Sequence, residues 1–86
     1  MKREYIKAYN ELKKMGVPVF VRDDMKQHGN FHISAEESNS SEWVSYYDGH
    51  YIPGWDCGVH PAIDSTLAKY GLHCEWQNPG ELSVWN

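Results

Sequence analysis

Basic residues, cysteines and long apolar runs are all scarce in this chain of 86 residues. Eight lysines and arginines stand against twelve acidic residues, so the formal net charge is −4 and no overall basic field attracts phosphate. No apolar run approaches membrane length, and we expect no signal peptide. These shortages argue against nucleic-acid binding and against a membrane protein, and they favour a cytoplasmic location.

The chain has few cysteines but many aromatic residues. Two cysteines, Cys57 and Cys74, are too few for a disulfide framework in a chain that otherwise has a cytoplasmic character. No motif predicts a cofactor, and we expect none. Aromatic residues, in contrast, make up 14% of the chain, with four tryptophans, six tyrosines and two phenylalanines. This is a high share for a domain with so small a core.

Hydrophobic periodicity predicts two helices and five strands. The first helix runs over 2–15 and ends at Gly16, and the second begins at Pro61 and stops at Gly71. Alternating apolar residues predict strands over 17–22, 31–35, 43–47, 72–77 and 81–85. Polar residues over 23–30 predict a loop, and Asn78-Pro79-Gly80 suits a tight turn between the last two strands.

The two ends of the chain share a pattern of helix, strand, strand. Residues 12–21, "LKKMGVPVFV", align with residues 67–76, "LAKYGLHCEW". A single unit of this kind cannot bury both its helix and its sheet face, so two units are expected to share one core. The sequence predicts a single α+β domain over 1–86, a two-layer sandwich of order αββ(β)αββ. Its antiparallel sheet has four or five strands with both helices on one face.

Three parts make up this predicted domain. The halves cover 2–35 and 61–86, and a connecting strand with an aromatic loop covers 36–60. We interpret the two halves as an internal repeat. A strand edge at Pro18, or in the C-terminal strand, could pair two chains, so the sequence is compatible with a monomer or a homodimer.

The stretch "GWDCGVHP" at 54–61 contains the main candidates for chemistry. Cys57 and His60 are three residues apart, a spacing that can supply half of a zinc site, with His50 or His73 completing it. Alternation turns Cys74 into the core and His73 to the other face, so these two do not readily serve one ion. The interpretation that we favour is a loop whose glycines and proline shape the entry into the second helix, with Trp55 and Val59 anchoring it to the core.

A cysteine nucleophile is the other chemical alternative for this stretch. Cys57 would need a lowered pKa and a base within hydrogen-bond reach, and His60 and Asp56 are the nearest candidates. Proline after His60 favours an extended backbone there. Short combinations of these residue types arise often by chance, so we expect no catalytic residue in this chain.

Two aromatic features predict contact with a partner instead. Five rings occur within thirteen residues: Trp43, Tyr46, Tyr47, Tyr51 and Trp55. Tyrosine and tryptophan combine a large apolar area with a polar tip, and they concentrate at binding surfaces. The alternative is that several of these rings fill the small core.

The second feature is the sheet face that points away from the helices. Alternation places Phe20, His32 and Trp85 on this face, together with Arg22, and a mixture of rings and polar groups there would form a binding patch. The sequence therefore predicts a small non-enzymatic protein-interaction domain. A short acidic chain of this kind is also typical of accessory or inhibitor proteins of phages and mobile elements. The alternatives are a zinc-stabilised domain and a small cysteine-dependent enzyme.

Overall fold

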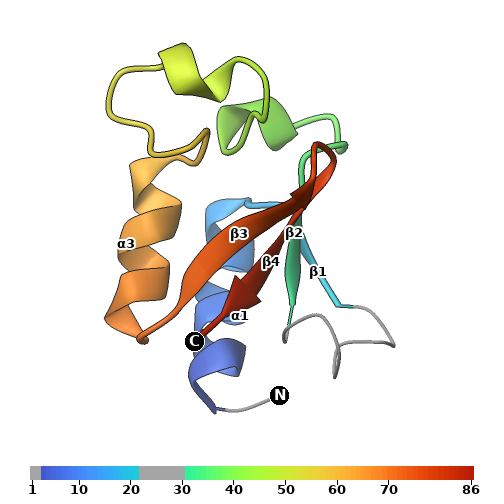
Figure 1. Ribbon diagram of the computed structural model, residues 1–86. Coiled ribbons are helices and arrows are strands. Elements are labelled where there is room, and N and C mark those ends of the chain that lie inside the picture. Colours follow the sequence, from blue (N-terminus) through green and yellow to red (C-terminus); the bar gives the residue numbers. More distant parts are fainter. Residues whose placement is uncertain (1–2, 22–30) are drawn as a thin grey trace.

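A sheet and a pair of helices form the two layers of the protein (Figure 1). The structure is a computed structural model that describes residues 3–21 and 31–86. Arg22 and the predicted loop over 23–30 lie outside the described residues. The elements in chain order are α1 (Arg3–Met15), β1 (Val19–Phe20), β2 (His32–Ser34), the short 3-10 helices η1 (Ser40–Glu42) and η2 (Gly49–Tyr51), α3 (Pro61–Lys69), β3 (His73–Asn78) and β4 (Glu81–Trp85).

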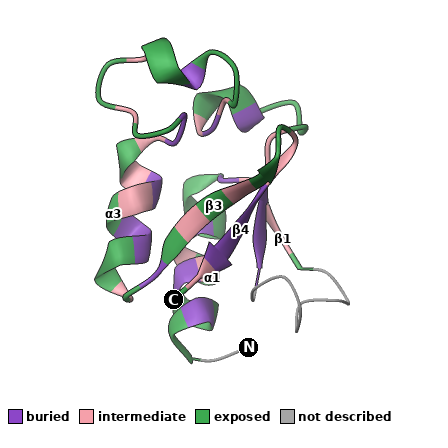
Figure 2. Ribbon diagram, in the orientation of Figure 1, coloured by how far each residue is buried: buried purple, intermediate pink, exposed green. Residues whose placement is uncertain are grey.

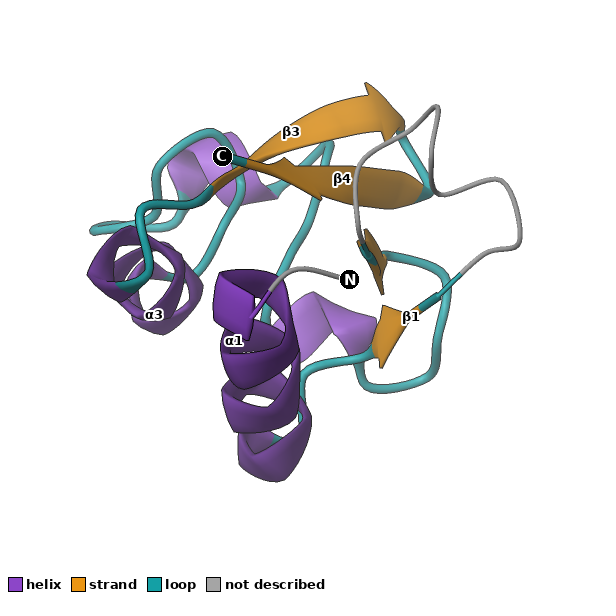
Figure 3. Cartoon of the chain, turned by 90° about the horizontal axis from the view of Figure 1, so that it is seen from below, coloured by secondary structure: helices purple, strands orange, loops and turns teal. Residues whose placement is uncertain are grey.

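The sheet has the strand order β1-β2-β4-β3, and every neighbouring pair is antiparallel. Both helices lie on the same face of this sheet, as the view from below shows (Figure 3). The predicted α+β two-layer fold is therefore confirmed. Each half has the order helix, strand, strand, while a duplication of the halves remains our interpretation. The C-terminal strand β4 lies inside the sheet, so the expectation that it offers a free edge is wrong; the edges are β1 and β3.

Helix boundaries follow the predicted signals. Helix α1 buries Tyr5, Ala8 and Leu12, whose spacing puts them on one face. It ends at Gly16, whose φ of +97° is favourable only for glycine. Helix α3 begins at Pro61, and its N-cap is His60, whose side chain accepts a hydrogen bond from the backbone N–H of Ala62.

The core lies between the helices and the sheet and is shown in purple in Figure 2. Its members come from α1, β2, α3 and β4 and from residues between the elements: Tyr5, Ala8, Leu12, Val17, Phe31, Ile33, Val44, Val59, Ile63, Leu67, Leu72, Leu82 and Val84. Cys74 packs against this core, as predicted, and burial raises the pKa of its thiol to about 12. Val59, which precedes the N-cap His60, is buried and packs on the core as predicted, whereas Trp55, the other predicted anchor, is half-buried and is not part of the core.

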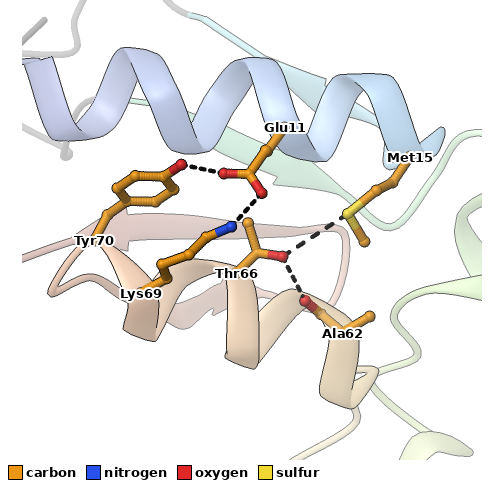
Figure 4. A network of polar contacts seen from close by, with 6 residues as sticks. All are labelled: Glu11, Met15, Ala62, Thr66, Lys69 and Tyr70. Atoms are coloured by element: carbon orange, nitrogen blue, oxygen red, sulfur yellow. Dashed lines mark hydrogen bonds and ion pairs between the residues drawn. The ribbon is translucent and has the colours of Figure 1, made fainter.

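A polar network joins the outer sides of the two helices (Figure 4). The carboxylate of Glu11 on α1 accepts hydrogen bonds from Lys69 and from the hydroxyl of Tyr70. One turn away, the hydroxyl of Thr66 donates to the carbonyl oxygen of Ala62, at 2.8 Å. The network lies at the solvent-exposed edge of the helix pair, where it fixes how α1 and α3 meet.

The strand predicted over 43–47 is absent, which is a correction to the sequence analysis. Residues 40–42 form η1, and Val44 makes only an isolated antiparallel bridge, to Val59. The physical reason is local hydrogen bonding by Ser40: its carbonyl accepts from the backbone N–H groups of Trp43 and Val44, and its hydroxyl donates to the carbonyl of Ser34. Because these bonds turn the backbone at residues 40–44, the chain does not form the extended hydrogen-bonded ladder of a β-strand here.

Candidate protein-interaction surface

The residues between the two halves cover the end of the molecule at which α3 begins (Figure 1). We call residues 43–55 the aromatic segment. Exposed residues predominate along 36–60, with a few buried positions that attach it to the body of the protein (Figure 2). One attachment is the side-chain amide of Asn39, which donates to the carbonyl of Gly16 at 2.9 Å. This hydrogen bond ties the chain just before the aromatic segment to the end of α1.

Two glycines fix the backbone at the base of the aromatic segment. A methyl group on Gly49 would lie 2.3 Å from the Cα of Gly58, and one on Gly58 would lie 2.2 Å from the carbonyl oxygen of Ser45. Both distances are far below van der Waals contact. The N–H of Ser45 donates to the carbonyl of Gly58 at 2.8 Å, and the N–H of Gly49 donates to the carbonyl of Ser45 at 3.1 Å. The closest contacts at this junction are therefore between main-chain atoms, and we call it the glycine contact.

Trp76 of β3 supports the first tyrosines of the segment. Its indole N–H donates to the carbonyl oxygen of Cys57 at 2.7 Å. The ring of Tyr46 meets Trp76 edge to face, with centroids 5.2 Å apart, and Tyr47 meets Tyr46 in the same way at 5.1 Å. Such pairs contribute about 0.5–1.5 kcal/mol each beyond the area that they bury. The three rings run outward from the sheet to solvent.

The five predicted rings divide into an outer and an inner group. Tyr46, Tyr47 and Tyr51 are 38%, 72% and 86% exposed, and we call them the outer tyrosines. Trp43 and Trp55 are half-buried, and each lies close to the ring of His60, with centroid distances of 5.2 and 5.6 Å. The inner rings thus attach the segment to the N-cap of α3, while the outer tyrosines remain available for contact.

The sheet face away from the helices differs from the open patch that the sequence predicts. His32 is only 1% exposed, so its expected role as an exposed binding residue is wrong. Its Nδ1 lies 3.0 Å from the hydroxyl of buried Ser83, and the ring of Phe20 stacks on it at 5.3 Å. Alternation had assigned the correct face to His32, but neighbouring groups bury that position.

Phe20 and Trp85, the other two candidates on this face, are half-buried. The indole N–H of Trp85 is shielded from solvent and has no hydrogen-bond partner within the part of the chain that the structure describes. Neither ring offers the exposure of the outer tyrosines. The aromatic segment is therefore the better candidate surface.

The environment of Cys57 does not activate a thiol. Cys57 is exposed and has a φ of +51°. A hydrogen bond with Asp56, together with the charge of that carboxylate, raises the pKa of the thiol, whereas a nucleophile needs a lowered pKa. The Nδ1 of His60 already accepts the hydrogen bond from Ala62 and caps α3. The contacts of Asp56, Cys57 and His60 therefore shape the loop before α3, and they do not activate the Cys57 thiol as a nucleophile.

The histidines and cysteines proposed as zinc ligands occupy separate environments. His73 pairs with Glu75 on the exposed side of β3, at 3.1 Å, while its neighbour Cys74 faces the core. His50 is exposed in η2. Within residues 3–21 and 31–86, no three side chains of the types that bind metals lie in an arrangement that could hold an ion.

Sequence reasoning missed Trp76, Gly49 and Gly58 as the residues that position the outer tyrosines. Alternation places Trp76 on the same face of its strand as Cys74, which indicates a core position, but it does not show that the ring also reaches the aromatic segment. Two glycines nine residues apart, on either side of a turn, were the available signal for a close backbone approach. Their pairing becomes evident only in three dimensions.

No helix in the described ranges is long and apolar enough to span a bilayer. Comparison with known proteins yields no match: no family model fits the chain, and no curated protein or solved structure resembles it significantly.

Proposed function

We propose that this chain is a small non-enzymatic protein-interaction domain that presents the outer tyrosines to a protein partner. One observation carries the proposal: Tyr47 and Tyr51 are 72% and 86% exposed on a segment whose backbone is held by the glycine contact. An exposed aromatic ring contributes little hydrophobic stabilisation to the fold, although a small domain has few other apolar groups to bury. Their exposure on a fixed support is typical of a binding surface.

Preorganisation supports the same proposal. Association is weakened by the ordering of loops and side chains, and a segment that is already held loses less freedom on binding. Tyrosine has only two side-chain torsions, so it supplies contact area at a low entropic cost. Tyr46 is further supported by Trp76, which limits the motion of its ring. The aromatic segment is thus preorganised for binding, as the binding surface of a matured antibody is.

The setting of this domain is part of the proposal. We place it in the cytoplasm, which fits the free thiols of Cys57 and Cys74. We propose that it acts as a monomer or homodimer, without nucleic acid or membrane, in the manner of an accessory or inhibitor protein of a phage or mobile element. The zinc-stabilised domain and the cysteine-dependent enzyme gain no support from the separated ligands or from the raised pKa of Cys57.

Site-specific photo-crosslinking tests the proposal. A benzophenone amino acid replaces Tyr47 or Tyr51 in cells that express the protein, and a matched control replaces Ile6, an exposed apolar residue of α1. We expect a discrete adduct with one protein from positions 47 and 51, and none from position 6. Equal labelling from all three positions, or no adduct from 47 and 51, would contradict an interaction at the aromatic segment.

A further inference from the structure

The charge around the aromatic segment is of one sign. The sequence contains no lysine or arginine between Lys26 and Lys69. The charged residues over 36–64 are all acidic: Glu36, Glu37, Glu42, Asp48, Asp56 and Asp64. The first five of these are exposed, and the sixth is half-buried. The end of the molecule that carries the outer tyrosines therefore has a negative surface, which the overall net charge of −4 does not reveal.

Within residues 3–21 and 31–86, the basic residues lie on the two helices. Arg3, Lys7, Lys13 and Lys14 are exposed on α1, and Lys69, at the far end of α3, is bound to Glu11. The aromatic segment covers the opposite end of α3 (Figure 1). The helices thus carry residues of both signs, whereas the lysines and arginines are missing from residues 36–64.

The directions of the pKa shifts of two groups agree with a negative field at this end. The pKa of the Asp64 carboxyl is raised, first by burial and then by the charge of Asp56. The pKa of the Cys57 thiol is raised mainly by Asp56, with a further contribution from Asp64. In both cases neighbouring carboxylates disfavour an additional negative charge, and the same field favours a cation.

Exposed tyrosine rings can also bind a cationic side chain through a cation–π contact. The negative face of an aromatic ring attracts ammonium and guanidinium groups. The protein already uses this contact elsewhere: Lys13 lies over the ring of Tyr9 at 5.7 Å, and Lys69 lies over that of Tyr70 at 5.3 Å. Tyr47 is followed directly in the sequence by Asp48, and both residues are exposed.

We infer that the partner of the aromatic segment is a basic protein segment, whose arginine or lysine side chains pack on Tyr47 and Tyr51 and pair with the acidic residues around them. This inference rests on the proposed function and adds the chemistry of the partner. Arginine fits best, because its planar guanidinium stacks on a ring and pairs with a carboxylate at the same time. Nucleic acids and anionic membranes would be repelled by the same surface.

A short peptide of alternating arginine and serine is the probe that tests this inference, and its glutamate-serine counterpart is the control ligand. Binding is measured by titration calorimetry for the wild type, Tyr47→Ser and Asp48→Asn. The matched control variants are Ile6→Ser and Glu4→Gln, which remove an exposed apolar and an exposed acidic residue from α1. Circular dichroism verifies that all four variants are folded.

We expect the arginine peptide to bind, and the glutamate peptide not to bind. Tyr47→Ser and Asp48→Asn should each raise the Kd by about five- to tenfold, while the α1 variants change it less than about twofold. Equal effects of the segment variants and the α1 variants would overturn the inference. Concentration-dependent self-association that Tyr47→Ser abolishes, but that Lys13→Glu and Lys14→Glu leave unchanged, would also overturn it, because the occupant would then be a second copy bound without its exposed lysines.

The crosslinking experiment separates the two proposals. If adducts form at positions 47 and 51 but map to a neutral or acidic stretch of the partner, the interaction stands and the basic partner is refuted. If no adduct forms at these positions, the interaction itself fails.

Discussion

The indole N–H of Trp76 donates a hydrogen bond to the carbonyl oxygen of Cys57, and this bond joins β3 to the segment that precedes α3. We expect Trp76→Phe to remove the bond while leaving a ring beside Tyr46. The loss should lower the free energy of unfolding by roughly 1 kcal/mol, as urea denaturation would measure.

Trp85→Phe is the matched control for that substitution. The Trp85 N–H is shielded and has no partner among residues 3–21 and 31–86. Its removal should therefore be neutral or slightly stabilising. If Trp85→Phe destabilised the protein as much as Trp76→Phe, the hydrogen bond to Cys57 would not be the cause of the effect.

The glycine contact leads to a second prediction, which concerns the stability of glycine-to-alanine variants. Gly58→Ala places a methyl group against the carbonyl of Ser45 and also strains a φ of +79°, so the free energy of unfolding should fall by roughly 3 kcal/mol or more. Gly54 has a φ of +86° but open space around it, so Gly54→Ala should cost only about 1–2 kcal/mol. Thermal or urea unfolding measures the difference. Equal losses would show that backbone strain alone, without the close approach, limits both positions.

The network of Glu11 makes stability depend on pH. Hydrogen bonds from Lys69 and then Tyr70 hold the pKa of the Glu11 carboxyl below its ordinary value of 4.5. A lowered pKa in the folded state means that the contribution is fully present above the unfolded value, and is lost as the pH falls through the folded one. Denaturation of wild type and Glu11→Gln should therefore differ near neutral pH and converge in acid. A gap that stayed constant down to strongly acidic pH would rule out this carboxylate as the source, and added salt should narrow the gap at neutral pH because the group is exposed.

Thiol labelling distinguishes the two cysteines. Because Asp56 raises the pKa of Cys57, this thiol should react sluggishly at neutral pH and faster as the pH rises. Cys74, with a pKa raised to about 12 by burial, should react only when the protein unfolds. Asp56→Asn should lower the pKa of Cys57 and speed its labelling, whereas Asp48→Asn should have little effect. Rapid labelling of the wild type near neutral pH would restore the hypothesis of a cysteine-dependent enzyme.

Helices and the C-terminal hairpin were predictable because their signals are local. The burial of Tyr5, Ala8 and Leu12 follows directly from their spacing, and Gly16 ends α1 where a left-handed residue is needed. Strand β4 matches its predicted range over 81–85, since alternation and the Asn78-Pro79-Gly80 turn agree there. In these elements, local preference and tertiary packing favour the same conformation.

The candidate surface was predictable only in part, because its geometry depends on contacts between distant residues. The alternation of Trp43, Ser45 and Tyr47 is typical of a strand, but hydrogen bonds to Ser40 and the glycine contact impose turns instead. The pattern likewise could not tell that the second face of β2 buries His32. The sequence located the rings, and the three-dimensional arrangement separated the outer tyrosines from Trp43 and Trp55.

The meeting of Gly49 and Gly58 has a consequence for how this protein can change. The closest contacts of this junction are between main-chain atoms, so they do not depend on which side chains project beyond it. The exposed positions His50 and Tyr51 can therefore be exchanged in evolution or in the laboratory without loosening the support, whereas Gly54, with its φ of +86°, and Trp55, which packs beside His60, are needed to hold the segment. The glycine contact can therefore support other side chains at these exposed positions. This makes the end of the molecule that carries them a suitable place to engineer new binding specificities.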